Sequence, residues 1–268
     1  MVSNETLLLR FISANVDWSP YLAQGSNRVY GRDFRIEEDR SYQDSSVEGN
    51  IALARKNNNW TFQGGLQMSN HNIKNKSIDT SNYWEKPHLG TLERIYFQNT
   101  SFEDKYKNVF DGSKAKVKID SFFAPENWER MYFNIEHGKH LREFYVNGEA
   151  AVFYGTNLNE INAHFIGGSW DMPDTNKSYG SKLFQYRLDQ GGLLNLRIDH
   201  PVVANLDISF EGGVVLSQDE QSGGLVLKLF KKFSGILIET GVSTQATFSG
   251  EHAQSQFVFA RVTCAGFL

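Results

Sequence analysis

Apolar and polar residues alternate with a period of two along most of the chain, which is the spacing of β-strands with one apolar face. The clearest run is 205–217, in which Leu206, Ile208, Phe210, Gly212, Val214 and Leu216 fall on one face of the strand, while Asp207, Ser209, Glu211 and Gly213 fall on the other. The alternation recurs in 60–68, 128–137, 143–154, 193–200, 224–230 and 235–249. No segment has a convincing helical period. The pattern predicts an all-β chain.

Turn-forming residues separate these runs, at 57–59, 124–127, 157–159, 201–205 and 231–235. Looser polar connections follow at 171–179, 218–224 and 249–255, so we expect hairpins with one tight end and one loose end. Polar stretches at 13–30, 70–90 and 101–112 are predicted to be loops or partly structured. Because no Gly/Ser-rich or Pro-rich linker interrupts the chain, we expect one domain over residues 1–268.

Several runs are 11–15 residues long, whereas strands of soluble proteins average about 5–6 residues. A strand tilted across a bilayer needs about 9–11 residues, with an apolar outer face and a polar inner face. The polar parity here carries charges of both signs on adjacent strands, such as Arg197 and Asp199 beside Asp207 and Glu211. Aromatic residues stand near strand ends, where interfacial girdles are expected: Trp60, Trp128, Tyr154, Trp170, Phe230, Phe248 and Phe267.

In these features the chain resembles bacterial outer-membrane β-barrels, especially the medium-sized monomeric porins of about 12 to 14 strands. The resemblance covers 45–268 and rests on the alternation and the hairpin asymmetry. It implies an antiparallel up-and-down transmembrane barrel, located in the outer membrane and surrounded by lipid. Barrels of this kind usually end in an aromatic residue, whereas here Leu268 follows Phe267.

The resemblance implies a monomeric channel for passive diffusion of small polar solutes or saccharides. Charged residues on the polar strand faces are then the candidates for the pore lining, where a field of mixed sign would orient hydrated solutes. These candidates are Arg130, Glu149, Arg187, Arg197, Asp199, Asp207, Glu211, Lys228 and Glu239.

A soluble sheet with one buried face explains the alternation equally well. The stretch from Trp128 through Tyr145-Val146-Asn147-Gly148 to Ile166-Gly167-Gly168 is similar to laminin-G and concanavalin-like jelly rolls. That likeness implies a soluble sandwich, extracellular or part of a virion, that binds carbohydrate or protein. The contacts expected in that case are Trp170, Tyr154 and Arg142.

A third interpretation is enzymatic. The run Trp60-Thr61, Asn70-His71, Ser77, Thr80-Ser81 and Trp84 resembles the catalytic strand of outer-membrane phospholipase A. In that family a serine nucleophile lies two residues beyond the histidine. Here this position is Ile73, which leaves no hydroxyl for His71 to deprotonate, so no catalytic residue is assigned.

Composition argues against several classes of partner and ligand. The 27 basic and 31 acidic residues are mixed along the chain, with a net charge of -4, so no basic stripe suggests nucleic acid. Cys264 is the single cysteine, and His137 and His140 flank a glycine without a metal-site spacing, so neither metal nor cofactor is expected. Residues 1–25 lack a signal-peptide pattern, which predicts either no export or a removed signal. No window approaches about 18 apolar residues, which excludes a spanning helix.

Overall fold

The computed structural model describes residues 6–17, 28–30, 36–41, 43–74, 87–104, 108–124, 126–158, 164–167, 175–179, 186–203, 206–217, 221–233, 236–249 and 255–264. Within these ranges every regular element is a β-strand. No helix in these ranges is long and apolar enough to cross a membrane.

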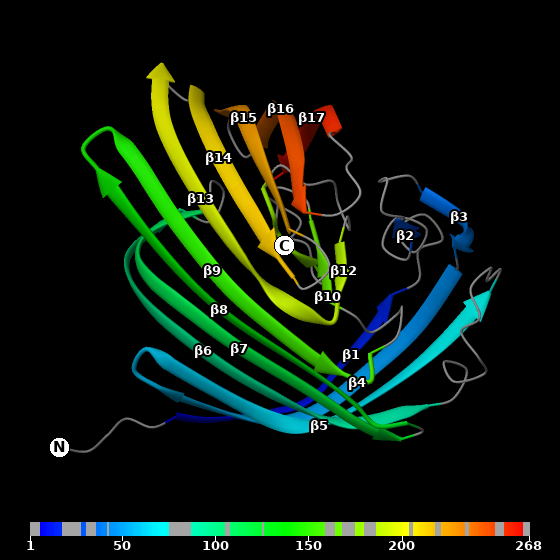
Figure 1. Cartoon of the computed structure of the whole chain (residues 1–268). Helices are drawn as coiled ribbons and strands as arrows, with labels where there is room; N and C mark the ends of the chain where they lie inside the picture. Colours follow the sequence, from blue (N-terminus) through cyan, green and yellow to red (C-terminus); the bar gives the residue numbers. More distant parts are fainter. Residues whose placement is uncertain are drawn as a thin grey trace.

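Twelve strands form one antiparallel sheet, in the order β1-β4-β5-β6-β7-β8-β9-β13-β14-β15-β16-β17. Their bounds are β1 (Thr6–Asp17), β4 (Gln43–Asn57), β5 (Trp60–Lys74), β6 (His88–Asp104), β7 (Val109–Ala124), β8 (Trp128–Leu141), β9 (Phe144–Thr156), β13 (Gln190–Val203), β14 (Leu206–Leu216), β15 (Gln221–Phe233), β16 (Ile236–Ser249) and β17 (Ser255–Cys264). Each strand pairs with the next in this order, so the topology is up-and-down, and the sheet curls so that it has a convex and a concave face (Figure 1). Strand type, pairing direction and up-and-down topology are confirmed. Within the described residues β1 and β17 do not pair with each other, so the sheet is not closed into the predicted barrel.

Five short strands lie apart from this sheet. β2 (Arg28–Tyr30) pairs with β3 (Ile36–Ser41). β10 (His164–Ile166) pairs with β11 (Thr175–Asn176) and β12 (Tyr186–Leu188) in the connection between β9 and β13. Figure 1 places β10 and β12 on the concave side of the large sheet.

Tight and long connections alternate along most of the sheet, as expected, and the short 125–127 connection between β7 and β8 is an exception at the end with the long connections. Residues 58–59, 142–143, 204–205 and 234–235 join strands at one end of the sheet, whereas 75–87 and 157–189 join them at the other. The first third is more regular than expected: β1 runs to Asp17, and β6 spans His88–Asp104. The sequence signal is weak there because several residues of the outward parity are themselves polar, such as Glu93 and Asn99.

The jelly-roll interpretation is wrong. A sandwich needs two packed sheets, but consecutive long strands of this chain are neighbours in one sheet. The presumed Asn147-Gly148 turn lies within β9, and the chain reverses instead at 142–143, where Arg142 has a φ of 58°. The proposed binding residues do not meet either. Arg142 lies in the tight turn, Tyr154 lies at the far end of β9, and Trp170 is outside the described residues.

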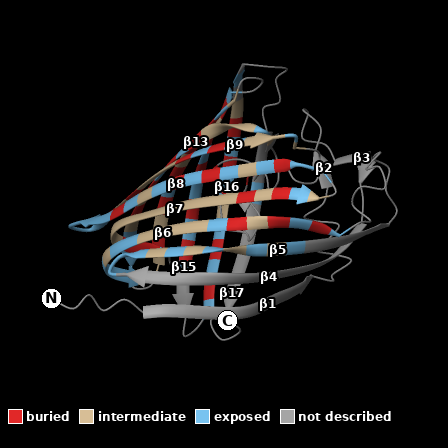
Figure 2. Cartoon of the chain, turned by 90° about the horizontal axis from the view of Figure 1, so that it is seen from below, coloured by how far each residue is buried: buried red, intermediate tan, exposed pale blue. Residues whose placement is uncertain are grey.

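The two faces of the sheet are inverted relative to a water-soluble protein. Along β8, Tyr132 and Asn134 are buried, whereas Phe133 and Ile135 are 41% and 46% exposed. Along β14, Glu211 is 1% exposed and its neighbour Phe210 is 52% exposed. Figure 2 shows buried and exposed residues alternating along these strands. In each strand the apolar residues point outward on the convex face, and the alternate, more polar residues point toward the concave face.

The face on which an aromatic side chain lies depends on its odd or even position in the strand, and not on its distance from the strand end. Trp60, Tyr154 and Phe248 lie on the convex face and are 44%, 49% and 65% exposed. Trp128 and Phe230 were predicted to join them, but both are buried on the concave face, so this prediction is wrong for these two residues. Trp128 stacks on Phe122 there, with ring centroids 4.3 Å apart. The predicted positions Trp170 and Phe267 lie outside the described residues.

One position on β8 tests the register of the sheet. A Cβ atom on Gly138 would lie 2.4 Å from the carbonyl oxygen of Phe110 and 2.4 Å from the Tyr145 hydroxyl. We therefore expect Gly138→Ala to lower the free energy of unfolding by about 1–3 kcal/mol, because the backbone must shift to admit the methyl group. Equilibrium denaturant titration of the folded protein measures this change.

Gly148 provides the matched control. It lies across the same strand pair, and a Cβ atom there would meet nothing within 4 Å. We expect Gly148→Ala to change stability by no more than about 0.5 kcal/mol. Equal stability of the two variants would contradict the described packing of β7, β8 and β9.

Candidate functional site

The connection between β9 and β13, residues 157–189, reaches into the concave face, and we call it the insert. Its described parts are 157–158, 164–167, 175–179 and 186–189. Ile166, Lys177, Ser178 and Tyr179 in these parts are all at least 95% buried. The concave face is therefore filled beside the insert.

An apolar contact holds one part of the insert. Ile166 is fully buried in a cluster with concave side chains of β8, β9, β13 and β14. The sheet residues of this cluster are Tyr132, Ala151, Phe153, Leu193 and Val215. Next to it, the ring of His164 lies 5.2 Å from that of Phe153, and its Nε2 is 3.2 Å from the carbonyl oxygen of Tyr154.

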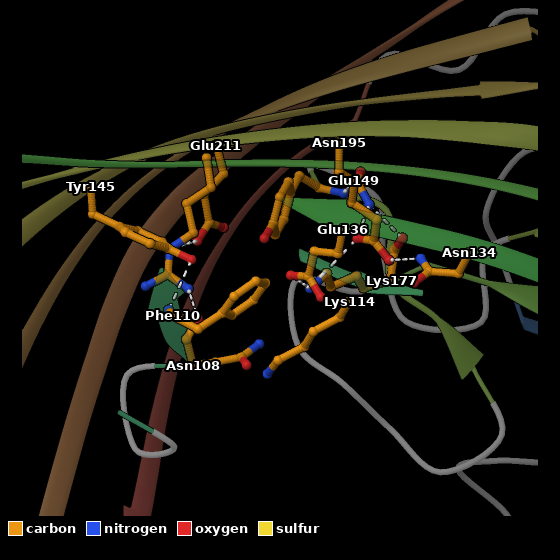
Figure 3. Close-up of polar contacts among 12 residues, drawn as sticks. Asn108, Phe110, Lys114, Asn134, Glu136, Tyr145, Glu149, Lys177, Asn195 and Glu211 are labelled. Atoms are coloured by element: carbon orange, nitrogen blue, oxygen red, sulfur yellow. Dashed lines mark hydrogen bonds and ion pairs between the residues drawn. The ribbon is translucent and has the colours of Figure 1, made fainter. Parts of the chain in front are cut away.

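Polar contacts hold the second part. Asn195 on β13 donates from Nδ2 to the carbonyl oxygen of Lys177 (3.0 Å) and accepts at Oδ1 from the backbone N–H of Tyr179 (3.3 Å). The Lys177 ammonium lies 3.5 Å from Glu149 Oε2 and 3.6 Å from Glu136 Oε1 (Figure 3). A buried ammonium requires such partners, so Lys177 fixes the insert to both β8 and β9.

A glycine on the wall leaves room for this docking. A Cβ atom on Gly213 would lie 2.7 Å from the Tyr179 nitrogen and 2.6 Å from Asn195 Oδ1. Only a residue without a side chain lets the backbone of the insert approach β14 this closely.

A second charged group lies beyond the insert, on β13 to β16. Arg197 makes a bidentate ion pair with Asp199, through Nε (2.9 Å) and Nη2 (2.6 Å). Lys228 donates to Glu211 Oε1 at 2.6 Å and lies 3.3 Å from Glu239 Oε1. All five groups are at most 9% exposed, so each cation is neutralised where it is buried.

A third charged group lies on β6, β7 and β8 and is more open. Asp120 accepts hydrogen bonds from Arg94 and, at 3.1 Å, from Arg130 Nη2. Lys116 and Lys118 have the same parity as Asp120 on β7 and are half-buried. The charged groups of the concave face are thus buried at β9 and β13–β16, whereas the cations on β6 and β7 are partly exposed.

The structure brings most of the predicted lining residues together. Eight of them lie on the concave face: Arg130, Glu149, Arg197, Asp199, Asp207, Glu211, Lys228 and Glu239. Arg197 and Glu211, predicted to be neighbours, are register partners with Nε and Oε1 3.9 Å apart. Arg187 lies instead in β12 of the insert, and its side chain is outside the described residues.

Several residues of the site escaped the sequence analysis. Lys114, Lys116, Lys118 and Asp120 alternate with Ala115, Val117 and Ile119, so the period-two signal in 113–120 could have identified them. Lys177 carried no such signal, because it lies in the polar connection at 171–179.

The other candidate residues form no shared site. His71 lies in β5 opposite Ser46, and its side chain is outside the described residues. His137 and His140 bond separately to Ser113 and Asp111. Among the described residues, no three His, Cys, Asp or Glu side chains are placed to hold a metal ion.

Comparison with known proteins supports the fold. No family model and no curated protein matches the sequence. Among solved structures, BamA from Haemophilus ducreyi lacking POTRA domains 1–3 is similar, with a TM-score of 0.56 and 11% sequence identity. The match covers 85% of this chain and 56% of that one, so the chain spans little more than half of that structure. At this identity the likeness concerns the fold alone, and it supports a β-barrel type of fold.

Gly213→Ala should dislodge the insert, because the added methyl group overlaps the backbone of Tyr179. Overpacking of about 1–3 kcal/mol should raise the open population, and with it the rate of limited tryptic cleavage after Lys177, about 5- to 150-fold. Gly212→Ala is the matched control, since its Cβ atom on the other face would lie 3.3 Å from Leu225 Cδ2 and 3.8 Å from the Gly224 carbonyl oxygen, and would not meet the insert. Equal cleavage rates in the two variants would disprove docking at Gly213.

Acid should also weaken docking. Burial, helped by the charge of Arg130, lowers the pKa of His164 from 6.5 to about 4. Once undocked, His164 regains its ordinary pKa and binds a proton below pH 6.5, so docking loses up to about 1.4 kcal/mol per pH unit between pH 6.5 and about 4. Hydrogen exchange of residues 164–179, corrected for the intrinsic effect of pH, should show this loss. His164→Gln should abolish it, and an unchanged pH dependence in this variant would contradict the assignment.

Proposed function

We propose that this protein is a monomeric β-barrel of the bacterial outer membrane, through which small polar solutes diffuse passively. The observation that carries the proposal is the inverted burial of the two sheet faces. Leu194, Leu196, Phe210 and Val152 lie on neighbouring strands and are each at least 50% exposed on the convex face. Exposed apolar surface of this extent marks an interaction with lipid or protein.

Strand length supports lipid as the surrounding medium. The twelve strands have 10 to 17 residues, enough to cross a hydrocarbon layer when tilted. The strands from β4 to β16 each bond to a neighbour on both sides, as a bilayer requires of a spanning segment, and β1 and β17 form the two edges of the sheet. Exposed apolar side chains occur on the convex face of every long strand from β5 to β16, with polar residues such as Glu93 and Asn99 among them on β6.

The concave face supports passage of small polar solutes. The insert and the buried ion pairs close the side formed by β9 and β13–β16. On the opposite side, Arg94, Lys116 and Lys118 are only partly buried. A path along β6 and β7 would be wet, charged and narrow, which limits it to small hydrated solutes.

The experiment is refolding followed by conductance. The chain expressed without detergent should aggregate, then refold in micelles to a form whose gel mobility changes on heating. Planar bilayers containing this form should show discrete conductance steps. A folded barrel that carries no current would contradict the channel, and a soluble monodisperse protein would contradict the membrane location.

Matched substitutions show which medium covers the convex face. Val152 and Val203 are 57% and 61% exposed, but Val152 lies within β9 and Val203 lies at the end of β13. In lipid, Val152→Arg should lower the free energy of unfolding by about 2–4 kcal/mol and Val203→Arg by about 0–1 kcal/mol. Exposure to water predicts that neither variant changes stability by more than about 0.5 kcal/mol.

A further inference from the structure

Four cationic side chains gather on the concave face of β6, β7 and β8. Lys116 and Lys118 have the same parity on β7. Arg94 on β6 is the register partner of Lys118, and Arg130 on β8 is the partner of Asp120. All four cations are partly exposed, so solvent contacts them on the concave face.

The charges in this group do not balance. Asp120 is shared by Arg94 and Arg130. Neither Lys116 nor Lys118 has an ion-pair partner among the described residues; the Lys116 ammonium lies over the Tyr132 ring, 5.6 Å from its centroid. Lys118 has the like charges of Lys116 and Arg94 as neighbours, and the opposite charge of Asp120 acts on it more weakly. Four positive charges and one negative charge leave a net charge of +3.

This arrangement costs stability. Like charges directly opposite each other on antiparallel strands destabilise the pair, and Arg94 faces Lys118 in this way. Elsewhere on the concave face the same chain neutralises its cations: Lys177 and Lys228 each lie within 4 Å of two carboxylates. The excess charge on β6–β8 is therefore a local property of this wall.

We propose that Arg94, Lys116, Lys118 and Arg130 form an anion-binding wall, which selects small anions and holds oxyanions such as phosphate, sulfate or carboxylates. An oxyanion offers several acceptors to the ammonium and guanidinium donors and relieves their mutual repulsion. Lys116 and Lys118 are specificity-determining residues, because no carboxylate among the described residues forms an ion pair with them. The selectivity rests on the proposed channel function, whereas anion binding does not.

Reversal potentials in a KCl gradient test the selectivity. Because a charged cleft concentrates counter-ions, we expect the wild-type barrel to prefer chloride over potassium by about threefold or more. Lys118→Glu should reduce this ratio, and Lys116→Glu combined with Lys118→Glu should bring it to about one or below. Lys139→Glu is the matched control. It makes the same change in net charge on an exposed convex position near the β8–β9 turn, and should leave the ratio unchanged.

Thermal unfolding in inorganic phosphate tests binding without any current. At equal ionic strength, phosphate should raise the unfolding temperature of the folded barrel above its value in chloride. Lys116→Gln combined with Lys118→Gln should remove this gain, while Lys139→Gln retains it. These neutral variants introduce no negative charge beside Asp120, and heat-modifiable gel mobility verifies that each is folded.

The outcomes separate the two proposals. No current from folded protein would overturn the channel, yet phosphate stabilisation lost in the double glutamine variant would still support the wall. Current without anion preference, or a preference unchanged by Lys118→Glu, would overturn the wall and leave the channel standing. Equal phosphate stabilisation in wild-type and double-glutamine proteins would also overturn the wall.

Discussion

The structure depends on the contact between the convex apolar face and the medium around it. Side chains such as Phe210 and Leu196 are about half exposed, which in water would cost roughly 25 cal/mol for each Å² of apolar surface. If lipid covers them, the rest of the architecture follows. The strands must be long, their backbone groups must bond to neighbouring strands, and charges must face inward.

Charges that face inward meet two different environments in this barrel. Around the insert they are buried and paired, because a buried ion without a partner costs several kcal/mol. Lys177, Arg197 and Lys228 all follow this rule. Along β6 and β7, Lys116 and Lys118 are partly exposed, and no carboxylate of the described residues forms an ion pair with them. One side of the concave face therefore buries paired charges, and the other keeps its lysines in contact with solvent.

The sequence predicted which face of the sheet each strand residue lies on, because this follows from odd or even position along the strand. It missed the features that depend on contacts between segments far apart in the sequence. Alternation placed eight charged residues on the concave face, because a residue's parity fixes its face once the strand is known. The same rule would have placed Trp128 and Phe230 on the concave face, because they are two residues from Arg130 and Lys228, which were predicted to line it. The docking of Lys177 could not be predicted, because it depends on the approach of a distant loop to Gly213 and Asn195.

Spin labels along β8 test most directly which medium touches each face. In a Cys264→Ser background, nitroxides at successive positions 131–136 should alternate in accessibility when the barrel is in bilayers. Labels at 131, 133 and 135 should be accessible to dissolved oxygen and shielded from a water-soluble nickel chelate, whereas labels at 132, 134 and 136 should be poorly accessible to oxygen. Access of the nickel chelate to 133 and 135 would show that water covers the convex face, and would contradict the account.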